Sequence, residues 1–255
     1  VVPKNLWSKH EESDDQNRIL MTCNNMLIRT GNKNILVDTG IGEKETDKFN
    51  KIYAVDLPRN LIPGLKELGL QPEDIDIVIN THLHFDHCGG NTRYDEDGNL
   101  VPAFPNAQYI INRSEWEDAF NPSSRSKASY LPENLKPVEE AGLLKLVESD
   151  YEVVPGVSVK VTGGHTRGHQ IVYVKSEGKT AVFLADTIPL TAQIRPNWVM
   201  SYDLYPVDTV NFKDAFLQEA FEGEYLLLFE HSPRIKAGYL RKDDRGRFAL
   251  EKVEV

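Results

Sequence analysis

The chain has 255 residues and a formal net charge of −10 at pH 7. A nucleic-acid binder needs a basic surface that neutralises phosphates, so this charge argues against a polynucleotide partner. No apolar run approaches the roughly 20 residues of a membrane span, and the first residues lack the apolar stretch of a signal peptide, so we expect a cytoplasmic protein that does not bind a membrane.

The first part of the chain predicts a β-hairpin and two helices. Two β-rich runs, Arg18–Arg29 and Asn34–Asp38, flank a Gly-Asn-Lys turn. Helical patterns follow at Glu43–Tyr53 and Asn60–Leu68. Gly69 comes directly after the second pattern, where a residue that tolerates the left-handed conformation commonly ends a helix.

The middle of the chain predicts two strands, a helix and a long loop. A short apolar strand at Ile75–Asn80 leads into the sequence THLHFDHCGG. A second strand is expected at Gln108–Ile111, followed by a helix for which Ser114 is the expected N-cap. The stretch Asn121–Pro137 is polar and rich in turn formers, which is typical of a long loop.

The second half of the chain is again rich in strands. The runs YEVVPGVSVKVTGG and QIVYVKSEGKTAVFLAD predict strands, Asp208–Phe221 predicts a helix, and YLLLFEH predicts a buried strand. The charged run Arg241–Arg247 is interrupted by acids and is typical of a solvated hairpin. Two similar groups of strands with helices between them predict two facing sheets with helices outside, and the absence of repeats and linkers predicts one domain over residues 1–255.

Histidine is concentrated at one place in the chain. Three of the seven histidines stand with an aspartate in the sequence THLHFDH. Residues two apart on a strand point to the same face, so His82 and His84 can direct both imidazoles into one space, while Asp86 and His87 follow in the turn. Imidazole nitrogen and carboxylate oxygen are ligands of Zn²⁺, Fe²⁺ and Mn²⁺. Four such ligands exceed what one tetrahedral catalytic ion needs, which indicates two ions and argues against a merely solvated turn.

Three further potential ligands stand where apolar strands are expected to end. His165 lies in VTGGHTRGH, Asp186 ends TAVFLAD, and His231 ends YLLLFEH. A single histidine or aspartate at a strand end is common in proteins that bind no metal. Three of them, in a chain that also carries the cluster in THLHFDH, favour a shared metal site.

At these residues the sequence resembles the metallo-β-lactamase fold superfamily. THLHFDH matches the H-x-H-x-D-H motif of that family, and GGHTRGH, LADT and FEHSP resemble its three later ligand segments. ILVDTGIG is similar to the family's opening strand and loop. The order of the segments is kept, and together they span most of the chain. The resemblance implies an α+β fold, the four-layer αββα sandwich, with the metals at one edge of the two sheets.

The resemblance also implies a ligand set: three residues for a first ion, three for a second, and one carboxylate that bridges them. In this chain the set is His82, His84 and His165; Asp86, His87 and His231; and Asp186. Asp86 is expected to be catalytic as well as a ligand. The two divalent ions are expected to be Zn²⁺, and Mn²⁺, Fe²⁺ or Co²⁺ also fit these donor atoms.

Two residues near the ligands are candidates for supporting them. Asp38 in LVDTG could accept the outer N–H of a ligand imidazole, although a turn-forming aspartate would look the same. In the family the first histidine of G-H-T-x-G-H is the ligand, so His169 is expected either to support the site or simply to be packed. Cys88 is expected to be small, buried and inert.

The resemblance implies a hydrolase in which a metal-bridging hydroxide attacks a small ester, lactone or organophosphate. Acyl-homoserine lactonases of this family carry a tyrosine three residues after the bridging aspartate, whereas this chain has Pro189 there. Trp198, Tyr202 and Tyr205 could form an apolar wall of the substrate pocket. An acyl-homoserine lactonase proper, a mononuclear iron sulfur dioxygenase and a metal protein without catalysis stay open as alternatives.

The loop Asn121–Pro137 is a further candidate for controlling substrate choice. Arg125, Lys127 and Tyr130 lie between turn formers rather than on an apolar face, so no core role is expected for them. We hypothesise that the loop borders the metal pocket. A homodimer, the commonest oligomer, is the default expectation for the assembly.

Overall fold

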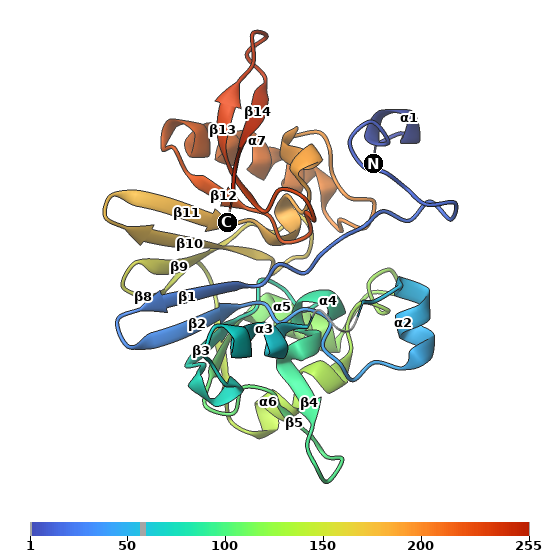
Figure 1. The fold of residues 1–255 in the computed structure, drawn as a ribbon, viewed down its shortest axis with the longest axis vertical. Coiled ribbons are helices and arrows are strands. Elements are labelled where there is room, and N and C mark those ends of the chain that lie inside the picture. The colour runs from blue at the N-terminus through green and yellow to red at the C-terminus, as the bar shows by residue number, and fades with distance from the viewer. Residues whose placement is uncertain (1, 57–59, 255) are drawn as a thin grey trace. The chain divides into compact units, whose positions relative to one another are not determined.

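The computed structural model describes residues 2–56 and 60–254. Its chain, traced in Figure 1, divides into two compact units. The central unit is Asn25–Glu148, and the terminal unit joins Val1–Asn24 to Ser149–Val255. The single domain predicted for residues 1–255 stays a prediction. None of the helices in the described ranges is long and apolar enough to cross a membrane.

A five-stranded sheet is the framework of the central unit. Its strands, in spatial order, are β1 (Met26–Thr30), β2 (Lys33–Val37), β3 (Ile77–Ile79), β6 (Gln108–Asn112) and β7 (Leu144–Val147). β1 and β2 form an antiparallel hairpin, whereas β2, β3, β6 and β7 run parallel. Parallel strands end at the same edge of a sheet, and Val37 pairs with Ile79 in the register. The residues that follow β2 and β3 are therefore brought together.

Helices and a small second sheet complete the central unit. They are α2 (Asp47–Tyr53), α3 (Leu61–Glu67), η1 (Pro72–Asp74), α4 (Phe85–Cys88), η2 (Gly89–Asn91), β4 (Thr92–Tyr94), β5 (Leu100–Pro102), α5 (Arg113–Phe120), η3 (Pro132–Asn134) and α6 (Lys136–Glu140). One apolar cluster joins Leu65 of α3 and Val138 of α6 to Val78 and Tyr109 of the five-stranded sheet. Burial of this surface holds the two helices on the sheet.

A seven-stranded sheet is the framework of the terminal unit. Its strands, in spatial order, are β14 (Phe248–Val253), β13 (Ala237–Lys242), β12 (Leu226–Leu228), β11 (Lys179–Phe183), β10 (Gln170–Ser176), β9 (Val157–Val161) and β8 (Tyr151–Val154). All neighbours are antiparallel except β11 and β12, which run parallel. Parallel neighbours need a crossover connection, and here the crossover contains the longest helix of the described residues.

That helix, α7 (Pro206–Glu222), packs on the seven-stranded sheet. The other helical segments of this unit are α1 (Lys4–Trp7), η4 (Ala185–Thr187) and η5 (Thr191–Ile194). Phe216 and Ala220, four residues apart on one face of α7, join Val182 of β11 and Leu227 of β12 in one buried cluster. The helix thereby ties the two parallel strands together.

The structure confirms several predicted elements and shortens others. The strand at Gln108–Ile111 and the helix at Asp208–Phe221 are confirmed as β6 and α7. The charged run Arg241–Arg247 is confirmed as the turn of a hairpin between β13 and β14. The buried strand predicted for YLLLFEH is limited to Leu226–Leu228.

Three predicted starts are wrong. The first strand begins at Met26 rather than Arg18, because the residues before it bond elsewhere: Asn24 N donates to Glu230 O at 2.9 Å. The helix predicted for Glu43–Tyr53 begins at Asp47, where Thr46 accepts a hydrogen bond from Phe49 N at 3.2 Å. The Ser114 cap is also wrong, since the Asn112 side chain caps α5 by accepting from the Ser114 backbone at 2.9 Å.

The expectation that Tyr130 has no core role is wrong as well. Tyr130 is only 4% exposed and packs in a cluster with Leu83 and Leu135. Its hydroxyl donates to the buried carboxylate of Glu115 at 2.9 Å, which satisfies the polar end of a buried ring. The loop Asn121–Pro137 is therefore anchored in the core of the central unit by at least one side chain.

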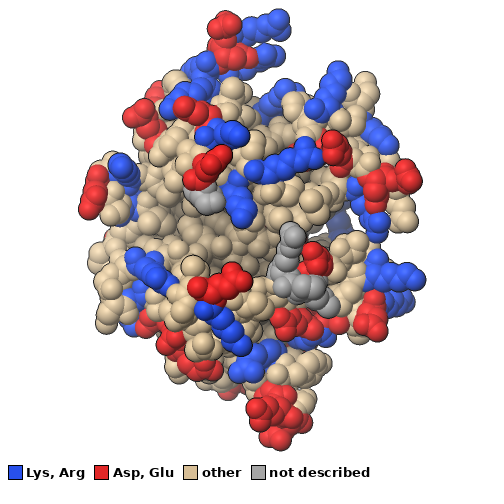
Figure 2. All heavy atoms as spheres, viewed as in Figure 1, with Lys and Arg blue, Asp and Glu red and all other residues tan. Residues whose placement is uncertain are grey.

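Charges of both signs are spread over the surface. Figure 2 shows Lys and Arg side chains interspersed with Asp and Glu on the face in view. Some pair with each other, as Arg18 does with Asp14 and Arg247 with Asp243, each at 2.7 Å. Such a mixed surface is not the basic stripe that a polyanion would need. The absence of a nucleic-acid partner stays a prediction.

Candidate metal centre

The central unit carries the ligand cluster directly after β3. His82 and His87 are fully buried and His84 nearly so. The ring centroids of His82 and His84 are 4.6 Å apart, and those of His82 and His87 are 3.9 Å apart. Asp86, on α4, has an oxygen 3.8 Å from His87 Nε2 and is the most accessible of the four. The structure thus confirms that these side chains gather in one place.

Asp38 orients His87 as the sequence suggested. It follows β2 with a left-handed backbone, φ 55°, which aspartate tolerates better than most residues. Its Oδ2 lies 3.1 Å from His87 Nδ1. A carboxylate only accepts, so His87 Nδ1 carries the proton and Nε2 keeps its lone pair for a cation. The parallel pairing of β2 with β3 explains why residues so far apart in sequence meet.

Thr81 extends this support to a second histidine. Its backbone N–H and its hydroxyl donate to Asp38 at 2.7 and 2.6 Å. The hydroxyl oxygen also lies 3.2 Å from His82 Nδ1. Because the hydroxyl proton goes to Asp38, the oxygen accepts from His82 Nδ1, and His82 Nε2 keeps its lone pair. Sequence reasoning did not single out Thr81.

The glycines of THLHFDHCGG are required by a close approach of two backbone segments. Thr39 N donates to His87 O at 2.7 Å, and Gly90 N donates to Gly40 O at 3.1 Å. A Cβ added at Gly89 would lie 2.0 Å from Ile41 O, and one at Gly90 would lie 2.3 Å from Thr39 O. Glycine at both positions therefore lets the loop after β2 lie against the turn that carries His87.

A buried carboxylate from α5 holds the same turn from another direction. Glu115 is fully buried, and its Oε1 accepts from Leu83 N at 3.1 Å and from the Tyr130 hydroxyl at 2.9 Å. The Tyr130 ring lies 5.0 Å from the ring of His84. Sequence reasoning missed Glu115, because a glutamate in the first turn of a helix is usually solvated. The loop Asn121–Pro137 does border the ligand turn within this unit.

We expect Glu115→Ala to lower the free energy of unfolding by about 2–3 kcal/mol, because Leu83 N and the Tyr130 hydroxyl would be left buried without their acceptor. Urea unfolding would measure the change. Glu117→Ala, an exposed position on the same helix, is the control and should stay within about 0.5 kcal/mol of the parent. Equal losses in both variants would contradict the role of Glu115.

The terminal unit brings two of its three candidates, both histidines, to the carboxylate of the third. His165 follows β9, Asp186 lies in η4 after β11, and His231 follows β12. Asp186 Oδ2 is 3.2 Å from His165 Nε2, and Asp186 Oδ1 is 2.8 Å from His231 Nε2. The two imidazoles therefore point the same kind of nitrogen at the two oxygens of one side chain.

The outer nitrogens of both rings are already held. His231 Nδ1 lies 2.7 Å from Thr22 O, and His165 Nδ1 lies 2.9 Å from Asp203 Oδ1. Both partners only accept, so both Nδ1 atoms carry protons. When the imidazoles are neutral, the Nε2 lone pairs face carboxylate oxygens, which is repulsive unless a proton or a metal ion shares the space. A divalent ion with imidazole and carboxylate ligands fits this donor set.

Electrostatics agree with a cation at this carboxylate. Burial lowers the pKa of His231, but the Asp186 carboxylate beside it, together with Cys23 and Glu230, raises the pKa well above its ordinary value. The same field that favours a proton on the imidazole favours a metal ion between the two side chains.

His169 supports Asp186 rather than lying apart from the site. It is fully buried, and its Nε2 accepts from Asp186 N at 3.1 Å. Its Nδ1 lies 2.7 Å from Thr162 Oγ1 and 3.2 Å from Thr187 Oγ1. Of the two interpretations left open for His169, support of the ligand segment is the one that these contacts favour.

We expect His169→Ala to lower the rate of the hydrolysis that the family resemblance implies by about tenfold to a hundredfold, because it loosens the backbone of Asp186 without removing a ligand. Its metal content, measured by mass spectrometry of the purified protein, should stay close to that of the parent. His165→Ala is the comparison and should lose metal. The ligand assignment is wrong if His169→Ala loses metal and His165→Ala keeps it.

The three aromatic residues predicted to line the substrate pocket lie in different surroundings. Trp198 is 7% exposed, with its ring against Arg195 and His10. Tyr202 is 45% exposed, and its ring centroid lies 5.8 Å from that of His165. Tyr205 is also exposed and is the residue before α7. Their contact with a substrate stays a prediction.

Cys88 matches the interpretation as an inert buried residue. Its thiol donates to Leu83 O at 3.3 Å, and burial raises its pKa to about 12. A thiol with such a pKa is not a nucleophile at neutral pH.

Lys213 on α7 is a buried cation that sequence reasoning missed. Its side chain is fully buried, and Nζ donates to Arg195 O at 3.0 Å and to Trp198 O at 2.7 Å. Burial lowers its pKa to about 7, against the opposing charges of Asp203 and Asp214. Lys213 therefore anchors the turn that carries Trp198 to the helix.

Comparison with known proteins gives consistent matches. Residues 18–231 match the family model described as the metallo-beta-lactamase superfamily. An N-acyl homoserine lactonase of Bacillus thuringiensis is 35% identical over 168 residues, 62% of this chain and 60% of the relative. The chain thus spans less than two thirds of the length of the curated relatives that it matches.

Solved structures agree with the sequence matches. A probable metal-dependent hydrolase from Staphylococcus aureus has a TM-score of 0.88 and 33% identity, covering 100% of this chain and 91% of its own. An N-acyl homoserine lactone hydrolase, solved with N-hexanoyl-L-homoserine at its catalytic metal centre, has a TM-score of 0.68 and 26% identity, covering 89% of this chain and 88% of its own. These similarities confirm the predicted α+β fold.

Proposed function

Because the chain belongs to the metallo-beta-lactamase superfamily, we propose that it is a metal-dependent hydrolase of small esters, lactones or organophosphates. The observation that carries the proposal is the approach of His165 Nε2 and His231 Nε2 to the two oxygens of Asp186, with both outer nitrogens held by acceptors. An arrangement prepared in this way for a cation is typical of a metal site.

We propose two divalent ions, with Zn²⁺ as the first candidate. The ligands follow the family's order along the chain. They are His82, His84 and His165 for one ion, Asp86, His87 and His231 for the other, and Asp186 between them. When bound, such ions lower the pKa of water to about 7 and polarise a carbonyl or phosphoryl oxygen.

The residues of the chain keep the donor atoms in place for that chemistry. Asp38 and Thr81 fix the tautomers of His87 and His82, so that Nε2 of each ring carries the lone pair that can bind a metal ion. The Asp86 side chain is 29% exposed, which makes it the ligand candidate within reach of a substrate or water. Its catalytic role, as an acceptor of a proton during hydrolysis, is part of the proposal.

An acyl-homoserine lactonase is the second candidate, because the curated relatives carry that name. The residue at one position argues that this chain binds its substrate differently from those lactonases. Pro189 stands where those enzymes have a tyrosine, and its carbonyl accepts from His231 N at 3.2 Å. This residue supports a ligand segment and has no hydroxyl to offer a substrate. We therefore place simple esters and lactones ahead of acyl-homoserine lactones.

Metal analysis and a substrate panel test the proposal. We expect two zinc or manganese ions per chain, and hydrolysis of p-nitrophenyl esters, lactones or phosphotriesters that a chelator stops and added Zn²⁺, Mn²⁺ or Co²⁺ restores. One iron per chain together with oxygen uptake on a persulfide would instead support a sulfur dioxygenase. Metal binding with no turnover of any of these would leave a metal protein without catalysis. A cytoplasmic location and a homodimer stay predictions.

A further inference from the structure

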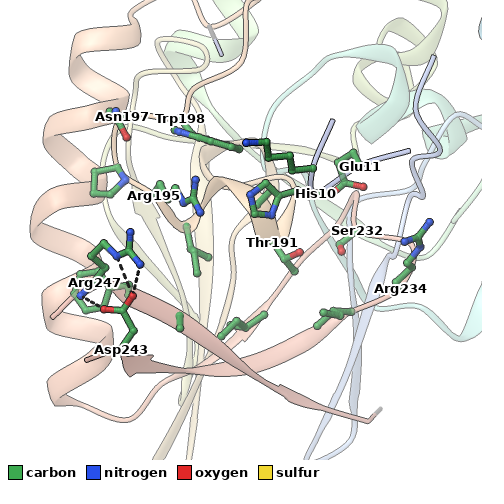
Figure 3. A pocket seen from close by; sticks show the side chains of 18 of the residues that line it. His10, Glu11, Thr191, Arg195, Asn197, Trp198, Ser232, Arg234, Asp243 and Arg247 are labelled. Atoms are coloured by element: carbon green, nitrogen blue, oxygen red, sulfur yellow. Dashed lines mark hydrogen bonds and ion pairs between the residues drawn. The ribbon is translucent and has the colours of Figure 1, made fainter. Parts of the chain in front are cut away.

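A cavity of about 880 Å³ lies within the terminal unit. Four segments line it: Lys9–Glu11 near the N-terminus, residues 191–198, residues 232–235, and the hairpin of β13 and β14 (Figure 3). The second segment begins five residues after Asp186, and the third follows His231 directly. The volume is that of a small-molecule site. The cavity therefore borders the chain segments that carry two of the proposed ligands.

Part of the cavity wall is apolar. Phe248 and Leu250 of β14, together with Pro233 and Ile235, line it and are all only partly buried. Half-buried apolar side chains in a concave surface gain free energy when a ligand covers them. The wall can accept a short hydrocarbon chain.

The cavity also carries unneutralised positive charge. The Arg195 guanidinium lies 4.5 Å from the centre of the Trp198 ring, and Figure 3 shows the two side chains next to each other in the cavity lining. Neither Arg195 nor Lys9 forms an ion pair with any residue of 2–56 and 60–254. The other two arginines of the lining differ, since Arg247 pairs with Asp243 at 2.7 Å and Arg234 pairs with Glu12 at 3.1 Å.

The pKa values of two neighbouring groups depend on the charges and the burial in this cavity. Burial lowers the pKa of His10, and the charges of Arg195 and Lys9 lower it further. Glu11 is the unpaired acid of the lining, and burial raises its pKa against the charge of Arg234. The effect of Arg195 and Lys9 on His10 is that of positive charge, which favours an incoming anion, whereas the Glu11 shift reflects burial.

We propose that this cavity binds an amphipathic carboxylate, with the hydrocarbon chain on Phe248 and Leu250 and the carboxylate at Arg195. Hydrolysis of an ester or a lactone releases an acid of this class, so the link to turnover rests on the proposed function. A planar guanidinium held over an aromatic ring is well suited to bind a carboxylate through two parallel hydrogen bonds.

The test is calorimetric titration of the metal-loaded protein with octanoate and with octan-1-ol, which share a chain and differ in charge. Octanoate should bind at least about tenfold more tightly than the alcohol. Arg195→Gln should weaken octanoate binding by about tenfold and leave the alcohol unchanged. Ala249→Trp, which places a large side chain in the lining, should weaken both ligands.

Arg241→Gln is the matched control. Arg241 also lies near an aromatic ring, 5.8 Å from the centre of Tyr239, but it does not line this cavity. It should bind octanoate like the parent. Three results would overturn the inference: no binding of octanoate, binding that Arg195→Gln leaves unchanged, and binding that Arg241→Gln weakens as much as Arg195→Gln does. The second result would indicate that octanoate binds elsewhere, for example at the metal ions.

The outcomes separate this inference from the proposed function. If octanoate binds through Arg195 but the substrate panel shows no hydrolysis, the cavity assignment stands and the proposed function fails. If hydrolysis is present but the two cavity variants leave octanoate binding unchanged, the proposed function stands and the cavity assignment fails.

Discussion

Asp186→Asn should remove most of the bound metal and lower hydrolysis by about a thousandfold. Asp186 presents one oxygen to His165 and the other to His231, so a single substitution affects both imidazoles. An amide offers one weak oxygen donor and an NH₂ group that repels a cation, and the neutral side chain no longer offsets the charge of two ions. We therefore expect both metal equivalents to be lost together.

Metal content per chain after dialysis, measured beside the rate on a p-nitrophenyl ester, checks this expectation. Asp214→Asn, an exposed aspartate on α7 in the same unit, is the matched control and should keep the metal and the rate of the parent. Circular dichroism should show an unchanged fold in both variants. A folded Asp186→Asn protein that retains two ions per chain would contradict the proposed bridging role.

Lys213→Met should lower the free energy of unfolding by about 2–4 kcal/mol near pH 9, because the Arg195 and Trp198 carbonyls lose their donor while the apolar stem is kept. At this pH the lysine of the folded protein is a neutral amine, since its pKa is lowered to about 7. A neutral amine still has two N–H groups, one for each carbonyl.

The pH dependence of this loss has a defined sign. Between the folded pKa of about 7 and the ordinary value of 10.5, the unfolded chain binds a proton that the folded chain does not. Stability of the parent therefore rises with pH across this window, and the methionine variant lacks that rise. The difference between the two proteins should be larger at pH 9 than at pH 7.

Urea unfolding of both proteins at the two pH values measures this difference, and groups common to both cancel. Lys252→Met, at an exposed position of β14, is the control and should change stability by less than about 0.5 kcal/mol at either pH. A difference that is the same at pH 7 and pH 9 would show that Lys213 is charged in the folded protein at both values.

Much of the candidate site could be predicted from sequence because its ligands are signalled locally. The cluster around His82 and His87 occupies consecutive positions after an apolar strand, and His165 follows another. Strand ends place side chains at the edge of a sheet whatever the rest of the chain does. Residue type and position relative to a strand were enough to identify candidates, and the family resemblance supplied their grouping.

The residues that hold those ligands were decided by tertiary structure. Thr22 O accepts from His231 across 209 positions, and Asp203 accepts from His165 across 38. No periodicity links such partners, because each is chosen by where a loop passes in space. A backbone carbonyl moreover has no residue type that could reveal it in a sequence.

Burial of polar side chains was likewise beyond the sequence. The local sequence predicts surface positions on a helix or a loop for Lys213, Glu115 and Tyr130, yet all three are buried. Each is buried because its polar end meets a partner that only packing brings near: two carbonyls for Lys213, and Leu83 N with the Tyr130 hydroxyl for Glu115. The sequence by itself determined the donor atoms and the strands that carry them. The tertiary structure determined the tautomers of the ligand histidines, the residues that support them and the burial of these side chains. These features depend on hydrogen bonds between segments that local patterns do not connect.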